Sequence, residues 1–402
     1  MQRLAKIIVA APPKEGQKVL ALTFMHGARR RLDERLAAVP GLGRRYECTT
    51  LDSFAARIVR RWQHLAVQLG ARLPAETEYE ETSAVAALLL ANPEVVLWVK
   101  ASFPILVLDE AQDLTRSRLN IVQCLATELT ALIAADEFQC LDATLRPNPA
   151  WEWLKEQQDH IALEKPMRTT VSALLEAAAA ARQGGPVNNG KGFTVHCTAR
   201  PELAGTFLSN HIGWNAKRQS LAVISPSIKD FAEDVVAWTV KSKTKAGNGP
   251  YRVEWEQAEA KLIGAILERI ALPDPATPQQ TLDAIQAVDD PALIREVSAW
   301  LDRLVRTHNE AIITPQALNE RIQSICANRR RFQRPSDYGM KAMSVHGAKN
   351  REFDHVVVLW PAAMAGDNEQ KRRLLYNAIT RAKSECLVLV QVAKQLNQPP
   401  FK

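Results

Sequence analysis

The chain has 402 residues, of which 47% are hydrophobic and 24% are charged, as in a globular protein long enough for two domains. Its formal net charge of +7 is compatible with a polyanionic partner but does not by itself identify one. No apolar run approaches the roughly 20 residues that would span a membrane, and the N-terminus lacks the apolar core of a signal peptide. No pair of its six cysteines has the close spacing of a zinc site. We therefore expect a cytoplasmic protein with reduced thiols and no membrane partner.

Strand and helix patterns alternate along the chain, which predicts an α/β fold with parallel sheets. The expected strands are residues 19–24, 105–108, 131–135, 193–197, 221–225, 355–360 and 386–390. Residues 4–10 and the alanine-rich stretch 171–182 are expected to be helical.

Two segments interrupt this alternation. From about residue 256 to 335 one helical pattern follows another, which predicts a helical insertion between two strands. Within it, Thr277-Pro278, Asp290-Pro291 and Thr314-Pro315 each have the form of an N-cap followed by proline at the first helical position. A smaller insertion is expected at about 61–100.

The most informative stretch is the apolar run 103–108, which is followed at once by Asp109 and Glu110. Such a run predicts a strand buried on both faces, and ligands of open α/β sheets bind at the carboxyl ends of such strands. In a nucleotide-hydrolysing site the first acid can hold Mg²⁺ and the second can orient and deprotonate the attacking water. A helix N-terminus that favours acids is the alternative for any strand followed by Asp-Glu, but the longer string DEAQD favours the catalytic interpretation.

Six further motifs share the chain with DEAQD. In order they are ALTFMH at 21–26, TTLDSF at 49–54, ADEFQ at 135–139, PMRT at 166–169, SVHGAKNREFD at 344–354 and RRLLYNAITRA at 372–382. In this order they resemble the UvrD/Rep/PcrA-like family of superfamily-one DNA helicases, over about residues 19–390. DEAQD and the last motif are the most specific, and the two insertions carry no motif of the family.

The resemblance implies two RecA-like domains of the P-loop NTPase fold, at 1–168 and 169–402, that close on ATP and Mg²⁺. Asp109 and Glu110 would bind the metal, and Glu110 would also act on water. Gln139 would contact water and phosphate, and Glu352 the sugar or phosphate side of the nucleotide. Arg168 and Arg381 would stabilise the charge on the transferred γ-phosphate, a role for which fixed guanidinium groups are well suited. For either arginine alone, a surface ion pair would be the better interpretation.

The resemblance also implies a groove for single-stranded DNA, or for DNA with a single-stranded tail. The matching positions are Thr23, Phe24, His26, Thr50, Ser53, His346 and Lys349. Binding of this kind needs phosphate contacts and an aromatic platform for bases. For Phe24 and Phe54, core packing is an equally good interpretation. The arginines at 329–331, with Arg334, are better explained as a solvated charge run than as phosphate contacts.

The sequence departs from the family at two of these motifs. The family carries a base-stacking aromatic shortly after the position of Gln139, where this chain has Cys140, and either Trp151 or Trp153 could replace it. The family's Lys-Gly pair is here Lys349-Asn350, which requires the asparagine to adopt the backbone conformation of a glycine.

The phosphate-binding loop is the largest departure. Families of this kind begin with a strand, a glycine-rich loop that ends in Gly-Lys-Ser/Thr, and a helix. Residues 4–10 resemble that helix, so we expect the chain to begin just past the loop. Residues 185–192 have the right glycine and lysine spacing, but they follow a helix and precede a strand, and Pro186 removes a donor. A turn is the better interpretation of this segment.

Three functions remain open on the sequence. The first is an ATP-dependent DNA helicase or translocase of repair, recombination or phage-related DNA processing, in a truncated form. The second is a non-hydrolysing DNA-binding or regulatory derivative, and the third is a subunit whose protein partner supplies the loop. The presence of Asp109, Glu110, Gln139, Arg168 and Arg381 together favours the first.

We expect the chain as given to show negligible ATP turnover in the presence of single-stranded DNA, because the loop that holds the β- and γ-phosphates is missing from it. Phosphate release with and without an oligonucleotide measures this. Substantial turnover that Glu110→Gln abolishes would contradict the expectation and indicate an unrecognised phosphate-binding loop in the chain.

Overall fold

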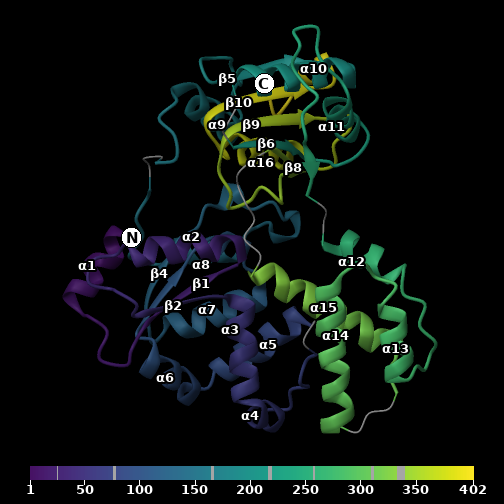
Figure 1. Ribbon diagram of the computed structural model, residues 1–402. Coiled ribbons are helices and arrows are strands. Elements are labelled where there is room, and N and C mark those ends of the chain that lie inside the picture. Colours follow the sequence, from purple (N-terminus) through teal and green to yellow (C-terminus); the bar gives the residue numbers. More distant parts are fainter. Residues whose placement is uncertain are drawn as a thin grey trace. The chain divides into compact units, whose positions relative to one another are not determined.

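All ladders between the named strands of the described residues are parallel, and they form two sheets (Figure 1). The computed structural model describes residues 1–24, 26–75, 78–163, 167–215, 220–256, 259–308, 312–332 and 340–402. Helices alternate with strands over most of this length, so the α/β class predicted from the sequence is confirmed.

The first sheet has the strand order β2-β1-β3-β4. Its strands are β1 (Val19–Thr23), β2 (Tyr46–Thr50), β3 (Ile105–Leu108) and β4 (Thr130–Ile133). Helices α1 (Gln2–Ala10) and α2 (His26–Ala37) cover one face through a shared apolar cluster. The alternate residues of β1 and β3 point to the opposite face and are buried as well, so the two central strands are apolar throughout.

The second sheet has the order β5-β10-β9-β6-β8-β7. Its strands are β5 (Phe193–Cys197), β6 (Leu221–Ser225), β7 (Glu254–Trp255), β8 (Met340–Ser344), β9 (Phe353–Trp360) and β10 (Ala382–Val390). Helices α9 (Ser172–Gln183) and α16 (Asn368–Ile379) pack on one face, and α10 (Pro201–Trp214) and α11 (Phe231–Lys241) pack on the other (Figure 1). Parallel strands covered on both faces are typical of a doubly wound sheet.

The remaining helices lie between these elements. They are α3 (Leu51–Arg61), α4 (Gln63–Gln68), α5 (Tyr79–Leu90), α6 (Pro93–Ser102), α7 (Arg116–Ala126), α8 (Pro149–Lys155), α12 (Glu259–Leu267), α13 (Pro278–Ile285), α14 (Pro291–Arg303) and α15 (Pro315–Phe332). Short 3₁₀ turns occur at Ala111–Asp113, Glu137–Gln139, Ala143–Leu145 and Ala393–Asn397, and a π-helical turn at Leu304–His308. Within the described ranges no single helix is long and apolar enough to cross a membrane; α5 and α6 pass that test only as a pair, bent by 96°.

The chain divides into two compact units. The first comprises Met1–Phe54, Leu90–Glu256 and Ser336–Lys402 and contains both sheets; the second comprises Ala55–Leu89 and Gln257–Pro335. The described part of the second unit is helical, with an apolar core drawn from α12 to α15. Most of the two segments expected as separate insertions therefore belongs to a single unit. The residue bounds of the two RecA-like domains stay a prediction.

The seven strands expected from the sequence are all present, with ends that differ by up to four residues, but three strands were missed. The missed strands are β2, β7 and β8, and their sequences carry no apolar run. β2 (YECTT) is an edge strand that is only partly buried, and β7 has two residues. The three predicted N-caps are confirmed: Thr277 forms a full capping box, and Asp290 and Thr314 accept hydrogen bonds from the backbone of α14 and α15.

A close approach between α10 and α11 explains the glycine inside α10. A methyl group at Gly205 would lie 2.5 Å from Cε3 of Trp238, so the ring would have to move. We expect Gly205→Ala to lower the free energy of unfolding by about 1–3 kcal/mol, even though alanine favours a helix. Gly264, inside α12, has no atom within 4 Å of such a methyl group. Gly264→Ala is the matched control, and it should stabilise the chain by about 0.5–1 kcal/mol in urea unfolding. Equal effects of the two substitutions would contradict this packing.

Candidate functional site

An acid pair stands at the carboxyl end of β3. The N–H of Asp109 donates to the carbonyl of Leu22 (3.3 Å), and its Oδ1 accepts from the N–H of Glu110 (3.1 Å). Burial, with the charge of Glu110 as the next cause, raises the pKa of Asp109 to about 6. Glu110 has a φ of +61°, a left-handed conformation that costs a non-glycine residue about 1–3 kcal/mol and is most common at functional sites. The structure thus places both predicted carboxylates together.

Gln112 holds this pair against the loop after β4. It is fully buried, its amide donates to the Glu110 carboxylate, and its Oε1 accepts from the N–H of Asp136 (3.0 Å). Its carbonyl accepts from Asn148 (2.7 Å). Gln112 was not predicted to have a role, although its place inside DEAQD was the available signal.

Gln139 lies where the loop after β4 meets the second sheet. Its Nε2 donates to Asp136 (3.0 Å), and its Oε1 accepts from Nη2 of Arg381 (3.3 Å). Two predicted site residues that are 242 positions apart are therefore in direct contact.

Arg381 is a buried cation, with 1% of its surface exposed. Besides Gln139, its guanidinium donates to the carbonyl of Asn377 (3.0 Å) and to Oγ1 of Thr380 (3.2 Å). All three acceptors are neutral, and no described carboxylate forms an ion pair with it. Burial, reinforced by the positive charge of Arg168, lowers its pKa to about 9, and the nearby carboxylates of Glu110 and Glu352 oppose that shift. The group therefore stays charged at neutral pH.

Arg168 and Glu352 form an ion pair beside Arg381. Nε of Arg168 lies 2.9 Å from Oε1 of Glu352, and its Nη1 donates to the carbonyl of Thr380 (2.5 Å). Glu352 also lies 3.1 Å from Arg31 and 3.6 Å from Lys383. Burial acts to raise the pKa of Glu352, but the three cations outweigh it and hold that pKa below its usual value. Arg31 and Lys383 were not predicted, because an isolated basic residue carries no signal of its partner.

Like Glu352, Asp136 is a carboxylate that contacts several side chains, here one basic and one aromatic residue. It forms an ion pair with Arg182 (2.9 Å), accepts from the hydroxyl of Tyr376 (3.3 Å), and caps the turn that carries Phe138. The rings of Phe138 and Tyr376 meet edge to face at 5.2 Å, with Arg182 over both. This cluster joins the loop after β4 to α9 and α16. Asp136, Phe138 and Tyr376 stand in motifs quoted from the sequence, and Arg182 does not.

Several positions predicted for DNA binding collect at the carboxyl ends of β1 and β2. Thr23 and Thr50 are register partners on these neighbouring strands, and both are buried. Thr50 bonds the hydroxyl of Ser53 (2.8 Å) and accepts from its N–H, so it ends β2 and caps α3. The ring of Phe24 lies under the guanidinium of Arg118 (5.4 Å).

The remaining predicted DNA residues are more dispersed. His346 is exposed, whereas Lys349 is buried in an ion pair with Asp113, with 2.6 Å between Nζ and Oδ1. Contact between Lys349 and a phosphate would require that pair to open, which is costly for a buried charge. Asn350 has a φ of +60°, the glycine-like conformation expected from the sequence.

Some predicted positions lie outside the described residues. These are Met25, Pro166 and Arg334, together with the side chains of His26 and of the arginines at 329–331.

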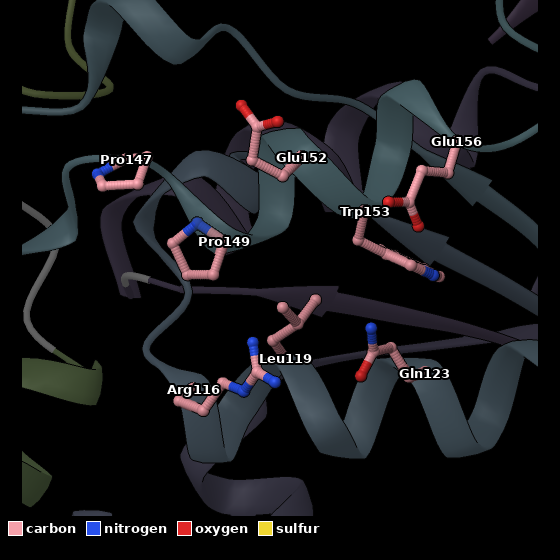
Figure 2. A pocket seen from close by; sticks show the side chains of 8 residues that line it. All are labelled: Arg116, Leu119, Gln123, Pro147, Pro149, Glu152, Trp153 and Glu156. Atoms are coloured by element: carbon pink, nitrogen blue, oxygen red, sulfur yellow. The ribbon is translucent and has the colours of Figure 1, made fainter.

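A pocket of about 520 Å³ lies between α7 and α8 (Figure 2). It is lined by Arg116, Leu119, Gln123, Pro147, Pro149, Glu152, Trp153 and Glu156. It contains none of the predicted nucleotide residues. Trp153, one of the two tryptophans considered as base-stacking groups, forms part of its wall, and Trp151 does not.

The fold and these contacts define a class: a parallel α/β chain in which an acid pair, a glutamine and a buried arginine meet at the ends of strands. Residues 340–389 match the family model of the UvrD-like helicase C-terminal domain, which supports a UvrD-like helicase family. The matched segment includes His346, Lys349, Glu352 and Arg381. A search of curated proteins finds no match to the chain.

The raised pKa of Asp109 has a consequence for stability. A carboxyl whose pKa rises from 3.8 to about 6 on folding binds its proton more tightly in the folded chain, so stability falls as the pH rises from about 4 to about 6. Asp109→Asn removes that charge and keeps the acceptor oxygen. We expect the variant to be more stable than the wild type by about 1–3 kcal/mol at pH 8, with an advantage that shrinks as the pH falls below 6. Urea unfolding at pH 8, 6 and 5 measures this, and an advantage that does not change with pH would contradict the assignment.

Proposed function

We propose that the chain provides the motor of an ATP-dependent helicase or translocase that moves 3′ to 5′ on single-stranded DNA in repair, recombination or phage-related DNA processing. The observation that carries this proposal is the buried guanidinium of Arg381, which meets Gln139 and is close enough to Glu110 for the two charges to interact.

Arg381 is poorly explained as a structural ion pair. Removal of a guanidinium from water costs several kcal/mol, and only an opposite charge and good hydrogen bonds offset that cost. Arg168 and Arg182 each have a carboxylate partner, but Arg381 donates to neutral oxygens alone. A phosphoryl group would supply the missing negative charge, and a fixed guanidinium is the group that stabilises such charge best.

The acid pair suits a divalent metal of the Mg²⁺ type. Carboxylate oxygens are its preferred protein ligands, and no described lysine or arginine forms an ion pair with Asp109 or Glu110. These two residues would hold the ion, which would neutralise charge on the phosphate oxygens when bound. Glu110 is oriented by the amide of Gln112 and would orient and deprotonate the attacking water.

The contacts of Gln139 support coupling between nucleotide binding and DNA binding. It bonds Asp136 on its own loop and Arg381 across from it, so a change in the position of Arg381 would move the loop after β4. That loop also binds Gln112 through the N–H of Asp136, and thereby Glu110. The partly exposed hydroxyl of Ser53, which lies beside Thr50 at the end of β2, supports contact with a nucleic-acid backbone, as does the net charge of +7.

The test measures whether nucleotide and DNA binding are coupled. Fluorescence anisotropy with a labelled oligothymidine gives the affinity for single-stranded DNA with and without millimolar Mg²⁺ and a non-hydrolysable ATP analogue. Because the loop that holds the β- and γ-phosphates is missing from the chain, the analogue is titrated to tens of millimolar. At saturation we expect it to change that affinity at least fivefold, as two linked sites require, and Arg381→Gln to remove the change. Arg252→Gln removes the same charge from an exposed arginine of the first unit and is the matched control.

The outcomes separate the candidate functions. Because Arg381→Gln removes a buried charge that lacks a carboxylate partner, we expect it to unfold at a temperature close to that of the wild type. DNA binding without any response to the analogue would reject the motor and favour a non-hydrolysing DNA-binding derivative. A response restored by a second protein would favour a partner that supplies the phosphate-binding loop, and absence of DNA binding would reject both DNA-binding functions.

A further inference from the structure

Three side chains that could bind a metal meet on the α10 face of the second sheet. They are His211 from α10, His355 from β9 and Glu385 from β10, and one ligand atom of each lies within 4.8 Å of the others. None of them belongs to the nucleotide or DNA positions considered above.

The sheet itself brings two of them together. His355 and Glu385 are register partners on adjacent parallel strands. Residues two and four positions further along each strand (Val357 and Leu359, Leu387 and Leu389) belong to the apolar cluster under α10 and α11. Because side chains alternate along a strand, His355 and Glu385 point to that same face. The α10 residues Leu208 and Ile212 pack in this cluster, and His211 lies beside them in sequence.

Two of the donors already lie at the separation that a shared ion requires. Nδ1 of His355 lies 3.4 Å from Oε2 of Glu385, which is longer than the usual 2.7–3.2 Å of an N–H···O bond. Two ligands of a tetrahedral zinc ion, each about 2.1 Å from the metal, are about 3.4 Å apart. All donor separations lie within 4.8 Å, so the widest would have to shorten by about 1.4 Å at most, which a side-chain rotation can supply.

The burial of the site gives an independent reason to expect a ligand. His211 is 6% exposed, and its buried Nε2 has no hydrogen-bond partner among the described residues. A buried polar atom left unsatisfied costs about 1–3 kcal/mol and needs an explanation. The side chain of Glu385 is 29% exposed, so the cluster can be reached from solvent.

We propose that His211, His355 and Glu385 bind a divalent transition metal, with zinc as the expected ion. Two imidazole nitrogens and one carboxylate form a donor set that suits zinc, whereas calcium and magnesium prefer oxygen ligands alone. Three protein ligands leave a fourth position for water. The ion would fasten α10 to β9 and β10.

Metal binding to the purified chain tests the site. After treatment with EDTA and removal of the chelator, zinc is titrated at pH 7.5 in competition with a chromophoric chelator. We expect one tight site and a rise of a few degrees in the unfolding temperature. His211→Gln and Glu385→Gln should each weaken the affinity at least 100-fold. His160→Gln, which removes an exposed histidine outside the cluster, should leave it unchanged.

Cobalt absorption identifies the ligand atoms, and circular dichroism checks that the variant is folded. Cobalt in this site should give the absorption of nitrogen and oxygen ligands, without a thiolate charge-transfer band. A thiolate band would place the metal on cysteines and overturn the proposal, as would zinc binding that Glu385→Gln leaves unchanged or no tight binding at all. Glu385 is partly exposed, so its variant should fold, and its circular dichroism without metal should equal that of the wild type.

Discussion

The candidate site depends on keeping the Arg381 guanidinium charged inside the protein. The end of α16 makes this possible. Carbonyl groups of the last helical turn have no partner within the helix, and the negative end of the helix dipole lies there. Arg381 follows Thr380, the C-cap of α16, and donates to the carbonyl of Asn377 and the hydroxyl of Thr380, while Arg168 donates to the carbonyl of Thr380. One helix terminus thus holds two arginines side by side despite their mutual repulsion.

The surrounding carboxylates form an ion pair with Arg168 but not with Arg381. Glu352 binds Arg168, Arg31 and Lys383, and Asp136 binds Arg182, so these cations have ionic partners in the protein. Arg381 interacts with the charges of Glu110 and Glu352 through space but forms no ion pair with either of them. Because a paired cation loses part of its attraction for a ligand anion, Arg381 is the group best suited to a phosphoryl charge. Arg168 is already paired with Glu352, so a ligand anion would have to compete with that carboxylate for it. The two predicted arginines therefore differ in their attraction for a phosphoryl group, although the sequence motifs predict the same role for both.

Features determined by residues close together in the sequence could be predicted, whereas contacts between residues far apart in the sequence could not. The buried strand before Asp109, the N-caps at Thr277 and Asp290, and the left-handed Asn350 were all predicted correctly, because each is determined by residues close in sequence. The edge strand β2 was missed because partial burial leaves it no apolar run. The ion pair between Lys349 and Asp113 joins residues 236 positions apart, and nothing local distinguishes a lysine that binds phosphate from one that binds an aspartate. Gln112 was visible in its motif, but its role required the position of the loop after β4.

The two proposals share the same strands of the second sheet. Glu352 stands just before β9 and Arg381 just before β10, while His355 and Glu385 lie three and four residues further along those strands. The pairing of β9 with β10 is irregular between Ala382 and Glu385, so the start of β10 is held by fewer regular hydrogen bonds than the rest of the strand. An ion bound to His355 and Glu385 would restrain both strands next to that irregularity. Since Arg381 has to meet Gln139 within hydrogen-bonding distance, a restraint on the first residues of β10 would act on the placement of the buried guanidinium itself.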